Sequence, residues 1–412
     1  MINVAILGFG TVGSGVADVL TMNADSIAKR VGQAVNLKYI LDVRDFPDSP
    51  YQSCFVKDFA VIESDPEVDV VVETIGGARI ALEFTQRALK AGKSVVSSNK
   101  ELVATHGYDL LQLAKANGVS YLFEASVGGG IPIIRPLYTC LMGEKIEEIT
   151  GILNGTTNFI LTKMDKEGLA FDVVLKEAQA LGYAEANPEA DVEGHDTCRK
   201  IAILTAMATG KEVNYEDIYT EGITKITDTD FKYAEKLGAS VKLFGSSRPQ
   251  GEKAVAFVAP VMIGKDHPLY SVSDVYNGVM VKGNMLGTSM FYGRGAGKLP
   301  TASAVVADIM EEAKHLNDNV VLGWGSEKLE IVPMEESSHA YFVRVSGQAD
   351  ALKELVCQEL GQCKVVTLDG MDEFAVVTET MQEKALKEAL AVLEAKLAAE
   401  GAKVLQMIRA EL

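Results

Sequence analysis

An acid and an amine lie four residues apart at the start of a predicted helix. Asp196 and Lys200 belong to the stretch 182–200, GYAEANPEADVEGHDTCRK, a polar segment between two apolar helical runs at 171–181 and 196–210. The spacing of four places both side chains on one face of the helix, and Glu185 lies in the loop before them. A carboxylate and an ammonium that meet from a loop and a helix start could hold a zwitterionic small molecule. An N-cap with a surface ion pair is the alternative, and spacing alone leaves both open.

A glycine-rich turn follows the first predicted strand, at residues 3–7. Six residues spell G-x-G-x-x-G at the start of a helix: Gly8, Phe9, Gly10, Thr11, Val12 and Gly13. In such a motif the glycines permit a tight turn, close approach of backbone N–H groups to a pyrophosphate, and close packing of helix on strand. The motif therefore indicates a dinucleotide site, with a glycine turn of an unrelated α/β protein as the alternative.

Strand and helix patterns then alternate up to residue 126. Apolar, β-branched runs at 37–43, 68–75, 94–99 and 119–126 alternate with helical patterns at 81–92 and 107–118. Repeated β-α-β units predict an α/β fold with a doubly wound, Rossmann-type parallel sheet that binds ligands at the carboxyl ends of its strands.

Several polar residues fall at those strand ends. Asp42 ends the second strand, where a carboxylate would bind the adenosine ribose of NAD, whereas Arg44 could pair with the 2′-phosphate of NADP. The choice between NAD and NADP stays open, with a slight preference for NADP. Thr74 and the stretch from Ser98 to Lys100 lie on the same cofactor side.

A second glycine stretch closes this region. Glu124 precedes Val127, Gly129 and Ile131, and three consecutive glycines expose backbone carbonyls. Hard oxygen ligands of this kind suit a monovalent or alkaline-earth cation. A flexible hinge that leaves the nucleotide domain is the alternative of equal weight.

The rest of the chain predicts two further domains. The turn at 154–158, with Gly155 and Thr156, opens a helix whose free N–H groups could bind a carboxylate. The pattern after residue 338 is β-α-β-β-α-β, a ferredoxin-like order. We expect a nucleotide domain at 1–131 plus about 299–316, an α+β substrate and dimerisation domain at 132–298, a linker at 317–337 and a C-terminal domain at 338–412.

Composition limits the class of protein. The chain has 412 residues and a formal net charge of −18, which argues against nucleic acid or an anionic membrane as a partner. No run of 18 apolar residues predicts a membrane span, and the N-terminus does not resemble a signal peptide. Five cysteines without metal-type spacing suggest reduced thiols in the cytoplasm, with Cys140 and Cys198 as buried thiols on helices.

These motifs together resemble homoserine dehydrogenase over essentially the whole chain. The matching segments are GFGTVG at 8–13, SSNKELV at 97–103, EASVGGGIPII at 124–134, GILNGTTNFI at 151–160, the stretch 182–200 and GRGAGKLPTASAVVAD at 293–308. The resemblance implies NAD(P)-dependent interconversion of L-homoserine and L-aspartate 4-semialdehyde, a step of threonine, methionine and isoleucine biosynthesis.

The resemblance also implies roles for single residues. The lysine matching Lys200 is the acid/base group, supported by Asp196, and the lysine matching Lys100 is close to nicotinamide and substrate. Glu185 would bind the substrate amine. The matching motifs add Gly155, Thr156 and Tyr183 to the substrate residues and Gly297 to the cofactor residues. The segment with Glu124, Val127, Gly129 and Ile131 resembles the monovalent cation site of the family, for Na⁺ or K⁺.

The C-terminal pattern resembles an ACT domain, which in this family binds threonine or assembles subunits. Residues 346–350 lack the proline–glycine turn common at ACT effector sites, so assembly into a homodimer or homotetramer is favoured over effector binding. Two other functions are weighed: a dehydrogenase of another amino acid, and a non-catalytic amino-acid sensor on a Rossmann plus ACT scaffold. Retention of Lys100 and Lys200 argues against the sensor.

Overall fold

The computed structural model describes residues 1–316, 319–320 and 322–412, and these residues form two compact units. Unit 1 contains Met1–Ile146, Ala202–Tyr215 and Gly283–Leu329; unit 2 contains Glu147–Ile201, Glu216–Lys282 and Glu330–Leu412. The predicted linker at 317–337 begins on Asn317 and Asp318, which lie outside the described residues. No helix within the described ranges is long and apolar enough to cross a membrane.

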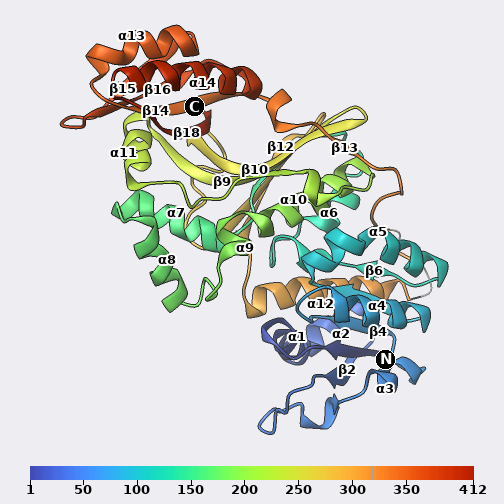
Figure 1. Cartoon of the computed structure of the whole chain (residues 1–412). Coiled ribbons are helices and arrows are strands. Elements are labelled where there is room, and N and C mark those ends of the chain that lie inside the picture. The colour runs from blue at the N-terminus through green and yellow to red at the C-terminus, as the bar shows by residue number, and fades with distance from the viewer. Residues whose placement is uncertain (317–318, 321) are drawn as a thin grey trace. The chain divides into compact units, whose positions relative to one another are not determined.

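Unit 1 is built on a six-stranded parallel sheet with the order β3-β2-β1-β4-β5-β6 (Figure 1). Its strands are β1 (Ile2–Leu7), β2 (Val35–Leu41), β3 (Phe55–Val56), β4 (Val70–Glu73), β5 (Ser94–Ser97) and β6 (Tyr121–Leu122). The strands form because their apolar runs are covered on both faces: β4 and β5 are buried at every position. The predicted doubly wound sheet is confirmed, although β6 is shorter than the run at 119–126 suggested.

Helices flank this sheet. They are α1 (Thr11–Met22), α2 (Ala24–Val31), α3 (Phe59–Ser64), α4 (Arg79–Lys90), α5 (Lys100–Ala116) and α12 (Lys298–Lys314). The short helix α6 (Ile134–Tyr138) also belongs to unit 1. The extra helix α2 accounts for the long interval between Gly13 and the second strand. Helix α12 packs closely on α1, because a Cβ on Gly15 would lie 2.7 Å from the Lys298 carbonyl oxygen.

Unit 2 is built on a mixed sheet with the order β11-β7-β9-β10-β18-β14-β16-β15. Its strands are β7 (Ile146–Ile152), β9 (Ala239–Gln250), β10 (Lys253–Gly264), β11 (Tyr276–Gly283), β14 (Ser338–Ser346), β15 (Cys363–Thr367), β16 (Glu373–Thr378) and β18 (Val404–Glu411). Strand β9 was not predicted, because polar residues interrupt its apolar pattern. One of them, Lys242, is buried and donates its Nζ to the Val272 carbonyl at 2.8 Å.

The remaining helices, short strands and 3₁₀ turns complete the chain. The helices are α7 (Gly155–Glu167), α8 (Phe171–Ala180), α9 (Glu189–Val192), α10 (His195–Thr209), α11 (Asp228–Leu237), α13 (Ala349–Leu360) and α14 (Glu383–Ala399). The strands are β8 (Tyr219–Thr220), β12 (Gly287–Arg294), β13 (Glu330–Ile331) and β17 (Met381–Gln382). The turns are η1 (Gln52–Cys54), η2 (Glu124–Ser126), η3 (Tyr215–Asp217) and η4 (Met334–Glu336).

The C-terminal segment has the predicted β-α-β-β-α-β order, from β14 through α13, β15, β16 and α14 to β18. Helices α13 and α14 cover one face of its strands (Figure 1), over a core that includes Tyr341, Phe374 and Leu393. Strand β18 also pairs in parallel with β10. The segment therefore shares one sheet with the preceding part of unit 2 and does not form a compact unit of its own.

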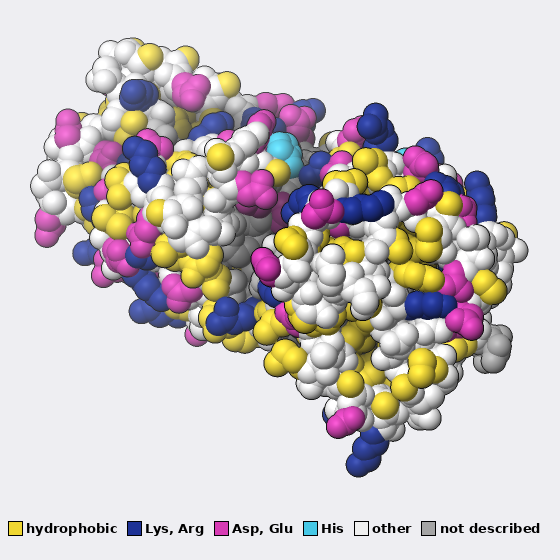
Figure 2. Space-filling model, turned by 90° about the horizontal axis from the view of Figure 1, so that it is seen from below, with side chains coloured by type: hydrophobic (Ala, Val, Ile, Leu, Met, Phe, Trp, Pro, Cys, Tyr) yellow, Lys and Arg dark blue, Asp and Glu magenta, His cyan; other side chains and the backbone are white. Residues whose placement is uncertain are grey.

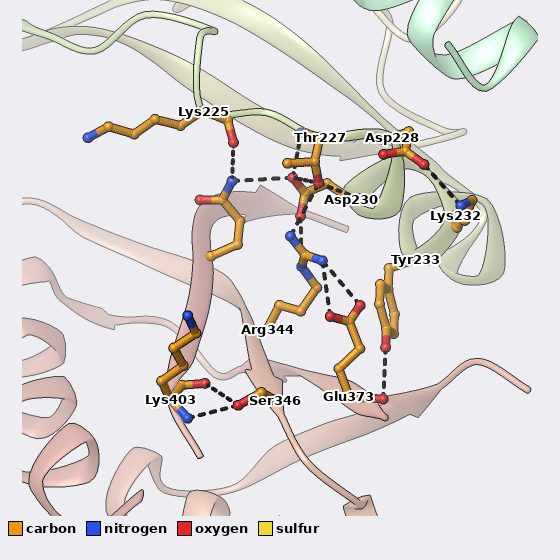
Figure 3. A network of polar contacts seen from close by, with 11 residues as sticks. Lys225, Thr227, Asp228, Asp230, Lys232, Tyr233, Arg344, Ser346, Glu373 and Lys403 are labelled. Carbon is orange, nitrogen blue, oxygen red and sulfur yellow. Dashed lines mark hydrogen bonds and ion pairs between the residues drawn. The ribbon is translucent and has the colours of Figure 1, made fainter. Parts of the chain in front are cut away.

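Buried ion pairs fasten the segment to the rest of unit 2. The Arg344 guanidinium of β14 lies between Asp230 of α11 and Glu373 of β16, at 3.1 Å from each (Figure 3). Arg409 of β18 makes two 2.8–2.9 Å hydrogen bonds to Glu383 and one of 2.8 Å to Glu221. Asp230 and Glu383 are fully buried. Each guanidinium thus connects strands of the C-terminal segment with elements that precede it.

The predicted state of the cysteines is wrong at three positions. Cys357 of α13 and Cys363 of β15 form a disulfide, because the short connection between helix and strand brings their Cα atoms within 5.8 Å. Cys140 follows α6 and is exposed, so it is not a buried thiol on a helix. Cys198 is buried on α10, as predicted.

Candidate active site and dinucleotide site

The glycine turn of unit 1 has the geometry that its sequence predicts. Gly8 adopts a φ of 90°, and a Cβ on Gly13 would lie 1.9 Å from the Gly8 carbonyl oxygen, so both positions require glycine. The Thr74 hydroxyl at the end of β4 donates to the carbonyls of Leu7 and Gly8, both at 2.9 Å. Thr74 therefore fixes the turn that would receive the pyrophosphate.

Asp42 is already engaged at the end of β2. Its carboxylate accepts the Phe9 N–H at 2.7 Å and the Nε and Nη2 groups of Arg44 at 3.1 and 2.9 Å. The Arg44 guanidinium holds the pKa of Asp42 down at about 2, so the carboxylate stays ionised. The two residues that sequence reasoning treated as alternatives form one ion pair.

A pocket of about 330 Å³ lies beside this ion pair. It is lined by Gly8, Asp42, Lys57, Ile80, Phe84 and Arg87, among others. Lys57 was not among the predicted residues, although its Nζ donates to the carbonyls of Asp42, Val43 and Arg44 at 2.6–3.2 Å. The basic and apolar side chains of the pocket suit the adenosine end of a dinucleotide.

The predicted residues Ser98 and Lys100 follow β5 at the same edge of the sheet. Ser98 donates its N–H to the Glu73 carbonyl at 3.3 Å, and Lys100 is the first residue of α5. The N-cap of α5 is Asn99, whose side-chain oxygen accepts the Leu102 N–H at 3.1 Å. Gly297 caps α12, also in unit 1, with a φ of 120°.

Unit 2 holds the second cluster, around Lys200. Lys200 and Asp196 are 8% and 2% exposed, and the Lys200 Nζ donates to Asp196 Oδ2 and to the Leu153 carbonyl, both at 2.7 Å. Asn154, the N-cap of α7, donates its Nδ2 to Asp196 at 2.8 Å and to Asp191 at 2.7 Å. The pair is therefore buried and anchored from three segments, and is not the surface ion pair considered as an alternative.

The other predicted substrate residues lie on the two segments that flank this cluster. Gly155 begins α7, where a Cβ would lie 2.9 Å from the Val275 carbonyl oxygen. Thr156 donates its hydroxyl to the Tyr183 carbonyl at 2.6 Å, and the Tyr183 ring packs edge-on against Phe159. Glu185 is exposed in the loop between α8 and α9. The loop is thus fastened to the start of α7 through Tyr183.

The predicted cation segment is buried around Glu124. The Glu124 carboxylate accepts three backbone N–H groups, from Ile133, Ile134 and Arg135, at 2.6–2.9 Å. The Asp308 carboxylate of α12 accepts a hydrogen bond from the Glu124 N–H and forms an ion pair with Arg135. Burial raises the pKa of Glu124, and raises that of Asp308 to about 7. Gly128 and Gly129 turn the backbone at φ values of 76° and 53°.

Both signs of charge occur on the surface. Basic side chains stand among acidic and apolar ones on the face shown in Figure 2. Across the residues that the structure describes, no group of three or more His, Cys, Asp or Glu side chains is arranged to hold a metal ion.

Comparison with known families and proteins gives consistent matches. The family described as "Homoserine dehydrogenase, NAD binding domain" matches residues 8–124, and the family described as "Homoserine dehydrogenase" matches residues 132–310. A homoserine dehydrogenase of Neisseria gonorrhoeae is 40% identical over 432 aligned residues, which cover 100% of this chain and 98% of that protein.

Solved structures give similar matches. The crystal structure of a homoserine dehydrogenase from Thiobacillus denitrificans superposes with a TM-score of 0.91 at 36% identity, covering 100% of this chain and 98% of that one. A hyperthermophilic archaeal homoserine dehydrogenase in complex with NADPH gives a TM-score of 0.63 at 29% identity, over 75% of this chain and 97% of that one.

Proposed function

Because the chain belongs to the homoserine dehydrogenase family, we propose that Lys200 is the acid/base group of its reaction. The observation that carries this proposal is the buried position of the Lys200 Nζ between Asp196 and the Leu153 carbonyl. Both contacts orient the amine, and the Asp196 carboxylate pairs with it at 2.7 Å. A lysine fixed in this way is suited to proton transfer. The sensor alternative has no support in these matches.

In the proposed reaction, Lys200 exchanges a proton with the oxygen atom of the substrate. When L-homoserine is oxidised, its hydroxyl proton would pass to the neutral form of the Lys200 amine, and a bound nicotinamide would supply the acceptor for the hydride from the carbon that carries the hydroxyl. In the reverse direction protonated Lys200 donates to the aldehyde oxygen of L-aspartate 4-semialdehyde. Asn154 donates to Asp196 and is itself held by Asp191, so both residues support the pair indirectly.

Recognition of the amino-acid part of the substrate is assigned to the segments around Lys200. Glu185 would pair with the substrate ammonium, since it is an exposed carboxylate in the loop fastened by Tyr183. Gly155 and Thr156 begin α7, where free N–H groups and the helix dipole favour a carboxylate.

The cofactor proposed is NADP in preference to NAD. A ribose 2′-hydroxyl of NAD would need a free carboxylate, but Arg44 and the Phe9 N–H already occupy that of Asp42. Arg44 and Lys57, which are paired with Asp42 and Asp45 in the structure, instead bring a guanidinium and an ammonium close to the pocket, and a 2′-phosphate would share them. Lys100 is proposed to act at the nicotinamide end, because it follows β5 at the carboxyl edge of the sheet.

A monovalent cation, Na⁺ or K⁺, is proposed at the carbonyls of Val127, Gly129 and Ile131 with the Glu124 carboxylate. Two buried carboxylates, Glu124 and Asp308, face a single guanidinium, that of Arg135. One negative charge is therefore uncompensated when both acids are ionised, and a bound cation would balance it. The carboxylate is shared with three N–H donors, so the backbone carbonyls would supply most of the ligands.

A homodimer or homotetramer in the cytoplasm is also proposed. Strand β12 and the turn before it expose apolar side chains: Met285, Leu286, Met290 and Tyr292. An exposed strand with such residues suits pairing with a second copy. The ACT-like segment is proposed to assemble subunits rather than to bind threonine.

The test is an assay at the nicotinamide absorbance band with L-homoserine and either NADP or NAD, with and without threonine. We expect faster turnover at low concentrations of NADP, no change with threonine, and loss of activity after exchange into a buffer free of Na⁺ and K⁺. Lys200→Ala should lose turnover by about 10³-fold while remaining folded at the assay temperature, although its melting temperature should fall because the buried Asp196 carboxylate loses its amine partner. Near-normal turnover in that variant would remove the acid/base role.

A further inference from the structure

A buried carboxylate lies directly below the strand ends of unit 1 that carry the cofactor residues. Glu73 is the last residue of β4, the strand between β1 and β5, and its side chain is fully buried. It accepts the Ile75 N–H at 2.7 Å and the Ser97 hydroxyl at 2.6 Å. Burial of a carboxylate costs free energy unless hydrogen bonds within the protein replace those it made with water, so the partners of Glu73 indicate what it does.

These contacts close a ring of four hydrogen bonds. Ser97 Oγ, which donates to Glu73, also accepts the Asn99 N–H at 3.1 Å. The Asn99 side-chain amide donates to the Ile75 carbonyl at 3.1 Å, and the Ile75 N–H returns to Glu73. The ring therefore joins the turn after β4 to the turn after β5, without passing through the sheet ladder.

The same ring fixes the start of α5. A further Asn99 Nδ2 contact reaches the Gly77 carbonyl at 2.8 Å, while the Asn99 side-chain oxygen caps the helix through Leu102 N–H. Lys100 is the first residue of that helix. The contacts of Asn99 therefore fix the backbone from which the Lys100 side chain starts.

We infer that Glu73, through Ser97 and Asn99, is a positioning residue that holds Lys100 and the turn 74–77 in register at the nicotinamide end of the sheet. The inference rests on the role proposed for Lys100. Glu73 does not touch substrate or cofactor; it acts through the ring. A displacement of about 1 Å in a reacting group is enough to reduce turnover severely, so an opened ring lowers kcat more than it weakens substrate binding.

Strand β5 provides a matched control at its other end. Ser94, like Ser97, is buried, and it donates its hydroxyl to a buried carboxylate, Glu312, at 2.6 Å. The two serines differ in position: Ser94 begins β5 and Ser97 ends it. Ser97→Ala and Ser94→Ala should therefore cost similar stability, whereas only the first opens the ring.

The experiment measures kcat, the KM values for L-homoserine and NADP, and the melting temperature of both variants. We expect Ser97→Ala to lower kcat about tenfold with the KM for L-homoserine within about twofold, and Ser94→Ala to keep the kcat of the unmodified enzyme. Equal kcat values in the two serine variants, at similar melting temperatures, would overturn the inference.

Two further variants separate this inference from the proposed role of Lys100. Glu73→Gln keeps the ring closed, since its amide can accept from Ile75 and donate to Ser97, and should retain the normal kcat; Glu73→Ala should behave as Ser97→Ala does. In a Lys100→Ala background, Ser97→Ala should lower kcat much less than it does alone, because only the turn 74–77 is left for the ring to position. Normal turnover in Lys100→Ala alone would remove the role of Lys100, whereas independent losses in the double variant would overturn only the positioning role of Glu73.

Discussion

At the scale of single residues, charged side chains are fixed by neighbours that are distant in sequence. Lys200 is held by Leu153, and Asp196 by Asn154, across separations of 47 and 42 residues. The spacing of Asp196 and Lys200 could be read from the sequence, because it depends on one helix. The roles of Asn154 and Glu73 could not be read from the sequence, because their partners come from other elements. An asparagine at a helix N-cap and a glutamate at the end of a strand also carry no signal of a site by themselves.

Arg44 gives a prediction for cofactor choice. Arg44→Ala removes the guanidinium beside the pocket and frees the Asp42 carboxylate. We expect the KM for NADP to rise about tenfold and that for NAD to fall or stay the same, because the 2′-phosphate loses a charged hydrogen-bond donor. Steady-state kinetics with each cofactor check this, with Arg30→Ala, at the end of α2, as a control. An equal rise for both cofactors would show that Arg44 does not discriminate.

Glu73 gives a prediction for stability against pH. Burial raises its pKa from 4.5 to about 7. Its titratable neighbour is Tyr121 of β6, whose pKa is also raised, chiefly by burial. The folded chain therefore binds a proton that the unfolded chain releases between pH 4.5 and 7, so stability falls as pH rises through this range.

Glu73→Gln removes this titration. We expect the unfolding free energy of the unmodified chain, relative to the variant, to fall by an amount on the order of 1–3 kcal/mol between pH 5 and pH 7.5. Urea unfolding of both proteins at the two pH values measures this change. The contribution of other buried acids, such as Asp308, is the same in both proteins and cancels in the difference. A parallel pH dependence in both proteins would contradict the raised pKa.

At the scale of elements, local patterns were reliable where one face or both faces of an element are apolar. The parallel strands β4 and β5 and the helices α7 and α12 follow from such runs. The pattern was not sufficient for β9, where Lys242 and three serines are buried. The partner of Lys242 lies in the loop at Val272, that of Ser246 in β7 and that of Ser240 in α7. The disulfide was missed because spacing cannot show that a helix end and a strand start face each other.

The disulfide gives a prediction for α13. Cys357 and Cys363 close a short loop between α13 and the edge strand β15. Reduction, or Cys363→Ser, should lower the unfolding free energy of unit 2 by about 2 kcal/mol, because the unfolded chain gains freedom. Melting with and without dithiothreitol measures the loss, and the reductant should have no effect on the Cys363→Ser variant. An unchanged melting temperature of the unmodified chain would count against a stabilising disulfide.

At the scale of the whole molecule, the C-terminal segment belongs to the sheet of unit 2. A chain that ends at Ser337 loses β18 from the edge of β10 and leaves Glu221 and Asp230 without their arginines. We expect unit 2 to lose about 3–5 kcal/mol of stability or more, because buried charges are left without partners. Calorimetry of the shortened and complete chains measures this. Identical transitions would show that the segment is independent.

The shared sheet also limits how a small molecule held by α13 and α14 could influence Lys200. Strands β14 and β18 are hydrogen-bonded to each other and β18 to β10, and two arginines bridge the joint. Binding at these helices cannot act on Lys200 through a rigid-body rotation of a separate domain. The coupling has to pass as a change in the twist of strands β14, β18 and β10, so we expect single substitutions in β10 to abolish it without altering the C-terminal helices or Lys200.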